Sequence, residues 1–154
     1  YSLDKAPEDI TRELCGRIEK NYAEDILPKP GVRAWLSYLK EKGIPMCVAT
    51  ASSAALGKRA LDRNGLLPYF DFMVDCGMVG VGKTSPAVYH LAAERLGGKA
   101  AECAVAEDAA FALKTAKEAG FFTIGVYESS EADQAGVRRY SDKYIRNFEE
   151  LIHG

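Results

Sequence analysis

Apolar residues follow two different spacings from Pro30 onward. In some stretches they recur every three or four residues, as on one face of a helix, and a glycine then ends the pattern. Predicted helices of this kind are 31–43, 52–65, 86–97 and 109–120, with a short terminal helix at 147–152. Short apolar runs between them are typical of buried strands, and these stand at 45–50, 70–74, 103–106, 122–126 and 143–145.

The alternation of these strands with helices predicts the fold class. Such an order is typical of βαβ units, in which a helix joins two parallel strands. We therefore expect an α/β fold of the Rossmann-like type, with a parallel sheet covered by helices on both faces. Ligands bind to such sheets outside the carboxyl ends of the strands, so the residues that end each strand are the first candidates for a site.

The N-terminal part of the chain has a different pattern. Residues 10–26 predict a single amphipathic helix with its apolar residues on one stripe. Residues 27–30, Leu-Pro-Lys-Pro, follow as a linker, because proline cannot continue a helix. The sequence thus predicts an appendage at 1–27 and a single α/β core at 28–154.

Composition and charge exclude several classes of partner. A chain of 154 residues with 47% hydrophobic residues is long enough for one domain with its own core. Twenty basic and twenty-two acidic residues give a net charge of -2, without a Lys and Arg cluster that could follow nucleic acid. Apolar runs are too short to span a membrane, and no leader pattern opens the chain. We therefore expect a cytoplasmic protein without a nucleic-acid or membrane partner.

The cysteines offer little metal or redox chemistry. They are widely spaced, form no Cys-x-x-Cys pair and have no histidine nearby that would complete a zinc site. Cys47 and Cys103 stand inside apolar runs, so we expect both to be small buried hydrophobic residues in a reducing compartment.

Polar residues stand where the predicted strands end. Thr50 ends one strand, and Lys83 opens the helix after a glycine-rich loop. The pair Glu107 and Asp108 ends a third strand. A hydroxyl and an ammonium can hold a phosphate, while carboxylates can hold Mg²⁺. Each residue alone has an ordinary structural explanation, but the set at one sheet edge favours phosphoryl transfer and lacks only a nucleophile.

These stretches resemble the haloacid dehalogenase (HAD) superfamily, and specifically its subfamily with a helical cap inserted after the first strand, which includes phosphoglycolate-phosphatase-like and β-phosphoglucomutase-like enzymes. VATASS is similar to the second motif, which gives Thr50 a phosphate-binding role, and the backbone N–H groups of Ala51 and Ser52 would add donors. GKTSPAVYHLAAERLG resembles the third motif, so Lys83 would be its phosphate-binding lysine.

VAEDAAFALKTAKEAGFFTIGV resembles the fourth motif, whose acidic pair serves the magnesium site. Asp108 would then be the direct Mg²⁺ ligand, with Glu107 as a second ligand or as its support. The resemblance implies a phosphohydrolase or phosphomutase that acts on a small phosphorylated metabolite through an aspartyl-phosphate intermediate. Residues 1–27 would be the C-terminal remnant of the helical cap.

The first motif of the family, an apolar strand ending in Asp-x-Asp with the nucleophile, has no counterpart in this sequence. In the family this strand lies between the strands that here end at Thr50 and at Glu107. Its absence should leave two inner strand edges unpaired. We expect a missing N-terminal segment or a second chain to supply the central strand.

Two other functions stay open. A truncated or degenerate HAD-like module could have a binding or structural role, because Thr84 and Ala109 replace the Pro and the Ser or Thr usual in the third and fourth motifs. The lesser alternative is a nucleotide binder, since Gly77 to Thr84 match the P-loop pattern G-x-x-x-x-G-K-[ST]. A P-loop helix begins at its lysine, however, whereas Pro86 indicates a helix that begins later.

Overall fold

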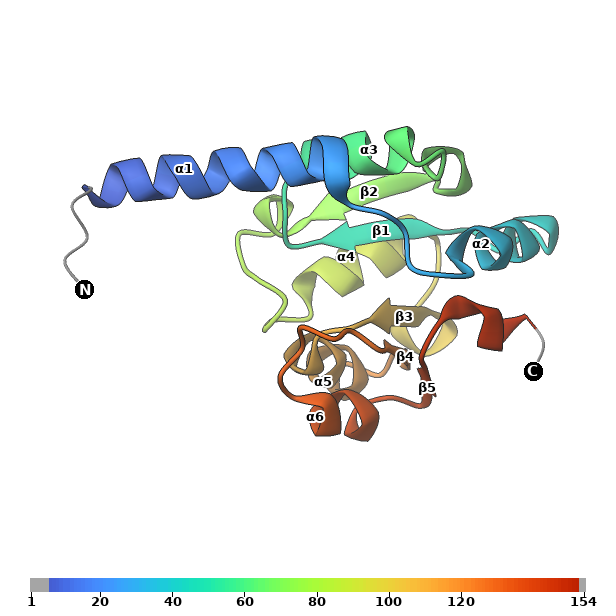
Figure 1. The fold of residues 1–154 in the computed structure, drawn as a ribbon. Helices are drawn as coiled ribbons and strands as arrows, with labels where there is room; N and C mark the ends of the chain where they lie inside the picture. The colour runs from blue at the N-terminus through green and yellow to red at the C-terminus, as the bar shows by residue number, and fades with distance from the viewer. Residues whose placement is uncertain (1–5, 153–154) are drawn as a thin grey trace.

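The computed structural model describes residues 6–152 and has the expected α/β architecture (Figure 1). Its helices are α1 (Pro7–Lys20), α2 (Val32–Glu41), α3 (Ala54–Arg63), α4 (Ala87–Arg95), α5 (Ala110–Glu118) and α6 (Gln134–Arg139). Its strands are β1 (Cys47–Thr50), β2 (Phe72–Asp75), β3 (Ala104–Glu107), β4 (Phe122–Val126) and β5 (Lys143–Ile145). Short turns are η1 (Asn21–Asp25), which is π-helical, and the 3-10 turns η2 (Leu67–Tyr69), η3 (Cys76–Met78), η4 (Ala100–Glu102) and η5 (Phe148–Leu151).

The strands form two parallel sheets rather than one. One sheet has the order β1-β2, with Thr50 opposite Asp75, and the other has the order β3-β4-β5, with Glu107 opposite Gly125. Within residues 6–152, β1 pairs with β2 alone and β3 pairs with β4 alone. The expectation of two inner strand edges without a partner is therefore confirmed for the described part of the chain.

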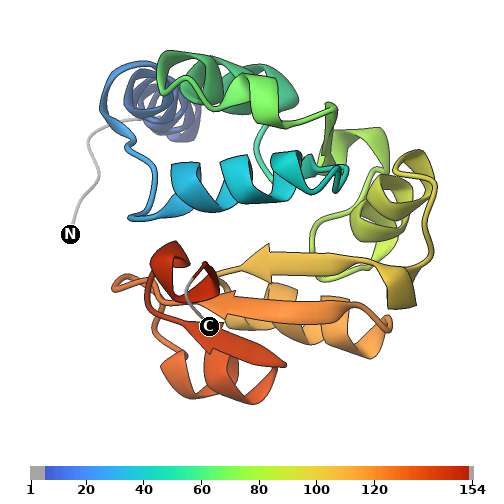
Figure 2. The same cartoon turned by 90° about the vertical axis from the view of Figure 1, so that its right-hand side faces the viewer.

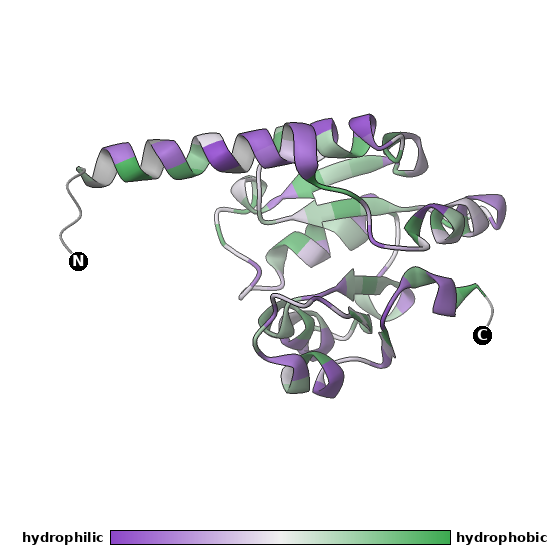
Figure 3. Ribbon diagram, viewed as in Figure 1, coloured by the Kyte–Doolittle hydropathy of each residue, from purple (hydrophilic) through white to green (hydrophobic). Residues whose placement is uncertain are grey.

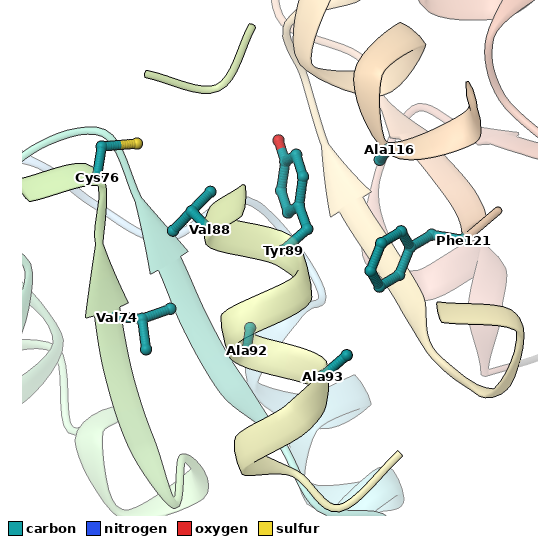
Figure 4. Close-up of a cluster of buried hydrophobic side chains, with 8 residues drawn as sticks. All are labelled: Val74, Cys76, Val88, Tyr89, Ala92, Ala93, Ala116 and Phe121. Carbon is teal, nitrogen blue, oxygen red and sulfur yellow. The ribbon is translucent and has the colours of Figure 1, made fainter. Parts of the chain in front are cut away.

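Helix α4 joins the two sheets into one core. Its buried side chains Val88 and Tyr89 pack with Val74 of β2 on one side and with Phe121, just before β4, on the other. Figure 4 shows these side chains standing between the two sets of strands. Apolar packing thus holds the halves together where no strand hydrogen bonds connect them.

The second sheet is covered on both faces, as the sequence predicted. Figure 2 shows α5 along one face of β3-β4-β5, and α2 packs from the other side through Val32 and Trp35. Trp35 of α2 packs against Ile124, Ile145 and Phe148, and Leu113 of α5 packs against Val137 of α6. No helix within the described part of the chain is long and apolar enough to cross a membrane.

The N-terminal helix lies along the top of the molecule and extends beyond the core (Figure 1). Residues 10–26 were expected to form a single helix, but α1 gives way to the π-helical turn η1 after Lys20. Turn η1 packs on α3, and the Asn64 side chain donates to the carbonyl of Ile26 at 3.1 Å. Figure 3 shows α1 as largely hydrophilic, and Leu14 on this helix is 55% exposed. Whether 1–27 and 28–154 are separate units stays a prediction.

Two other expectations from the sequence were wrong in detail, and one helix was missed. The terminal helix is only the 3-10 turn η5, which a capping box of Asn147 and Glu150 stabilises. Helix α6 was not predicted, because its six residues carry few apolar positions. Cys76 is the buried cysteine, whereas Cys47 and Cys103 are only partly buried.

Gly31 fixes how the linker enters α2. Its φ of 78° is in the left-handed region that favours glycine. A Cβ on this residue would lie 2.5 Å from the backbone nitrogen of Glu149 and 2.9 Å from the carbonyl carbon of Phe148. We expect Gly31→Ala to reduce the free energy of unfolding by about 2–4 kcal/mol, from backbone strain plus the clash with η5. Thermal unfolding would measure this loss.

Gly43→Ala is the matched control for this prediction. Gly43 also has a positive φ, 69°, but a Cβ there would meet nothing within 4 Å. Gly43→Ala should therefore reduce the free energy of unfolding by only about 1–2 kcal/mol, which is the cost of the left-handed backbone without a clash. Equal losses in the two variants would show that packing against η5 does not constrain Gly31.

Candidate active site at the carboxyl ends of β1 and β3

The loop after β1 is held in place by Asp75. One carboxylate oxygen of Asp75 accepts from the backbone nitrogen of Ala54 at 2.8 Å, and the other accepts from that of Met78 at 3.1 Å. The Thr50 hydroxyl accepts from the backbone nitrogen of Ser52 at 3.1 Å. Asp75 therefore ties the predicted phosphate loop to the segment that leads to Lys83. Sequence analysis gave Asp75 no such role.

The same loop contacts the N-terminal helical segment. The hydroxyl groups of Ser52 and Tyr22 lie 3.0 Å apart and form a hydrogen bond. Ala51 is exposed directly after the strand, at the carboxyl end of β1. Tyr22 of η1 thus lies beside the residues that the sequence assigned to phosphate binding.

Lys83 and Glu107 form a nearly buried ion pair. The Lys83 ammonium donates to Glu107 Oε1, and the two side chains are only 13% and 10% exposed. The Tyr89 hydroxyl donates to the same oxygen at 3.4 Å. Burial, with the nearby Glu107 charge, raises the pKa of the Tyr89 phenol, so this hydroxyl keeps its proton and remains a donor. Figure 4 shows Tyr89 on the β3 side of α4. No pattern in the sequence had indicated a role for Tyr89.

Asp108 has surplus negative charge around it. Burial raises the pKa of its carboxyl, the neighbouring Glu107 raises it further, and Lys29 offsets only part of this effect. Asp108 is nevertheless 40% exposed. It opens on a hollow of about 140 Å³ lined by Lys29, Ala106, Glu107, Asp108, Val126 and Phe148. A cation bound in this hollow would relieve the charge on Asp108.

Lys29 reaches this hollow from the linker. Its ammonium lies 2.5 Å from Glu128 Oε2 and 3.6 Å from Asp108 Oδ2, and it donates to the Tyr127 carbonyl at 3.2 Å. The Lys29 hydrogen bond, with additional bonds from Ser130, lowers the pKa of the Glu128 carboxyl to about 2. Sequence analysis treated Lys29 only as part of a linker. Its partner Glu128 lies 99 residues further along the chain, so no local pattern indicated the contact.

The structure brings together only part of the predicted site. Lys83 pairs with Glu107, and Asp108 follows Glu107 in the chain, with its backbone nitrogen donating to Glu107 Oε2 at 3.1 Å. No hydrogen bond among the described residues joins them to the Thr50–Ser52 loop, which lies in the other sheet. The two groups therefore stand at the ends of strands in different sheets, and β1 and β3 do not pair within residues 6–152.

The carboxylates present fit Mg²⁺ better than a transition metal. Residues 6–152 contain no cluster of three or more His, Cys, Asp or Glu side chains suited to a metal ion. Mg²⁺ needs only one or two carboxylates, because it keeps several waters and binds substrate phosphate oxygens. Asp108 is a carboxylate that is 40% exposed on the hollow and so has the donor chemistry for such an ion, whereas Glu107 is occupied by Lys83.

The geometry does not favour a P-loop. Helix α4 begins at Ala87, four residues after the lysine, with Pro86 at its N-cap. The Lys83 ammonium binds Glu107. A P-loop lysine instead lies at the start of its helix, beside the phosphates of the nucleotide.

Parallel strands covered by helices, with a lysine–carboxylate pair at the carboxyl end of β3, place the chain in the α/β class. Residues 2–120 match the family model described as haloacid dehalogenase-like hydrolase. The chain belongs to this family, as the resemblance of its motifs indicated. The fold, with parallel sheets and helices on both faces, agrees with this family assignment.

Similar proteins handle phosphorylated sugars. The chain is 31% identical over 123 residues to the fructose-1-phosphate phosphatase YqaB of Escherichia coli, covering 80% of this chain and 64% of that protein. It is 33% identical over 138 residues to the β-phosphoglucomutase of Bacillus subtilis, covering 88% of this chain and 58% of that protein. It is also similar to the crystal structure of a CbbY mutant from Rhodobacter sphaeroides in complex with xylulose-(1,5)bisphosphate, with a TM-score of 0.81 and 29% identity. That match covers 98% of this chain and 69% of CbbY. The chain spans less than two thirds of the length of both curated relatives.

Proposed function

We propose that this chain is the phosphate- and metal-binding part of a Mg²⁺-dependent phosphatase or phosphomutase that acts on a small phosphorylated sugar. The contact of Lys83, Glu107 and Asp108 at the carboxyl end of β3 carries the proposal. A lysine beside an acidic pair at this edge suits a phosphoryl group and a divalent ion together. The phosphorylated sugar is inferred from the names of the related phosphatase and mutase.

Lys83 would stabilise the negative charge that develops on the phosphoryl oxygens. Its ammonium is already positioned by Glu107, so little reorganisation is needed when the phosphoryl group arrives. Thr50 and the backbone N–H groups of Ala51 and Ser52 would bind the phosphoryl oxygens from the β1 side. Bound Mg²⁺, held by Asp108 with support from Glu107, would supply further charge neutralisation at a phosphoryl oxygen.

The nucleophile would come from a strand that enters between β1 and β3. Among residues 6–152 neither edge pairs with a further strand, so a parallel strand could pair with both. An aspartate at the carboxyl end of that strand would attack phosphorus as the ester P–O bond breaks, and the leaving sugar oxygen would take a proton from the second aspartate of the Asp-x-Asp motif. Water would then hydrolyse the aspartyl phosphate and release inorganic phosphate. A missing N-terminal segment or a second chain would supply the strand.

Phosphate release by the complete natural protein tests this function. We expect Mg²⁺-dependent release of phosphate from hexose and pentose phosphates, lost with EDTA and restored by Mg²⁺. Beryllofluoride, which attaches to an aspartate, should raise the melting temperature only when Mg²⁺ is present. Intact mass under denaturing conditions would show whether a segment beyond the 16.8 kDa chain accompanies it.

A truncated or degenerate module remains the second candidate. Ala109 favours it, because this residue stands at the N-cap of α5 without a side chain that could cap the helix or support the acidic pair. Such a module would neither release phosphate nor respond to beryllofluoride. The cytoplasmic location expected from the sequence stays a prediction.

A further inference from the structure

Lys29 places a positive charge beside the candidate metal ligand. Its ammonium lies 3.6 Å from Asp108 and 2.5 Å from Glu128, and its third contact is the carbonyl of Tyr127. The side chain is 30% exposed, so its charge is only partly screened by water. One ammonium is thus shared between an acid that would bind Mg²⁺ and an acid that would not.

The arrangement differs from an ordinary surface ion pair. A surface pair joins two long side chains in water and contributes little. Here the ammonium is also fixed by a backbone carbonyl and stands on the wall of the small hollow that contains Asp108. A cation entering this hollow would therefore meet the charge of Lys29 at close range.

We propose that Lys29 is an internal counter-ion that competes with Mg²⁺ for Asp108, and that Glu128 weakens this competition by holding the ammonium to one side. The inference rests on the proposed role of Asp108 as a Mg²⁺ ligand. Under this inference, a residue of the linker between the N-terminal helical segment and α2 sets the affinity of the site for Mg²⁺. Metal binding and the position of this linker are then coupled, and each must affect the other.

Mg²⁺ titration by calorimetry on the complete natural protein, without substrate, tests the proposal. Lys29→Met removes the competing charge and should lower the Kd for Mg²⁺ by about tenfold, a Coulomb effect reduced by partial solvent screening. Lys29→Arg keeps the charge and should keep the Kd within about twofold. An unchanged Kd in Lys29→Met would overturn the proposal.

Lys117→Met is the matched control. Lys117 pairs with Asp142 at 2.9 Å, and the two side chains are 38% and 34% exposed, close to the values for Lys29 and Asp108. This variant removes the same charge and the same kind of ion pair away from the hollow. Its Kd for Mg²⁺ should equal that of the wild type, and a decrease as large as in Lys29→Met would overturn the assignment to this site.

Glu128→Gln separates a specific role from a general charge effect. With Glu128 neutral, the ammonium of Lys29 is left to Asp108, so Mg²⁺ should bind about threefold to tenfold more weakly than in wild type. The double variant K29M/E128Q should bind Mg²⁺ as tightly as Lys29→Met alone, because the ammonium that Glu128 holds away from Asp108 is no longer present. If the two effects instead add, Glu128 acts only through its own charge and the proposed coupling is wrong.

Asp108→Asn distinguishes this inference from the proposed function. If Asp108→Asn binds Mg²⁺ as wild type does, both the metal site and the competition by Lys29 are wrong. If it loses Mg²⁺ binding while Lys29→Met has the wild-type Kd, the metal site stands and only the role of Lys29 is overturned. Loss of binding in Asp108→Asn with tighter binding in Lys29→Met supports both.

Discussion

Asp108→Ala should abolish Mg²⁺-dependent phosphate release by the complete protein. This carboxylate has a raised pKa because of burial and the neighbouring Glu107, and it is the partly exposed acid of the pair. Without it, the hollow at the end of β3 has no free carboxylate, because Glu107 is engaged with Lys83. Steady-state phosphate release over a Mg²⁺ series is the measurement, and added metal should not restore the rate.

Asp62→Ala provides a control for this experiment. Asp62 is an exposed acid on α3, so its loss changes the net charge equally without touching the hollow. It should release phosphate at the wild-type rate. Asp108→Ala at a wild-type rate, with the fold intact, would exclude Asp108 as the metal ligand.

Lys83→Ala is expected to have the second large effect, on both rate and stability. Losing one preorganised donor to the transition state costs about 10²-fold or more in kcat. The same change leaves the carboxylate of Glu107, only 10% exposed, without its cationic partner. Breaking a buried pair from one side costs about 3–5 kcal/mol of stability. Phosphate-release kinetics and thermal unfolding measure the two losses separately.

The double variant K83M/E107Q separates these two losses. It removes both charges of the pair, so most of the stability lost in Lys83→Ala should return. The rate should stay at least about 10²-fold below wild type, because no ammonium faces the phosphoryl group. A rate that recovers together with the melting temperature would mean that Lys83 is structural rather than catalytic.

Much of the fold followed from local patterns in the sequence. Ser53 caps α3 as a hydroxyl residue before an apolar helix face should, accepting from the backbone nitrogen of Leu56. Helix α6 was missed because its stability comes from a cap at Asp133 and from packing of Val137 against α5, and neither depends on periodicity. The π-helical turn η1 was likewise not predicted, and it packs on α3, which lies far along the chain.

The site divides in the same way. Lys83 and Asp108 were predicted as site residues because each stands in a motif, Asp108 directly after β3 and Lys83 shortly before α4, and their roles stay predictions. Lys29, Asp75 and Tyr89 were missed because their importance comes from partners far along the chain, such as Glu107 for Tyr89. Position at the end of a strand was enough to nominate candidate residues, and only the fold shows which side chains contact them.

The two facing strand edges also affect how this part of the protein resists unfolding. Without a strand between them, β1-β2 and β3-β4-β5 are joined by side-chain packing around α4 and not by a continuous hydrogen-bonded ladder. Each sheet can then open as a cooperative unit of its own. A strand paired with both β1 and β3 would merge the two units into one. Insertion of that strand would then complete the active site and make unfolding cooperative at the same time. The protein would then be rigid only when the strand that carries the nucleophile is in place.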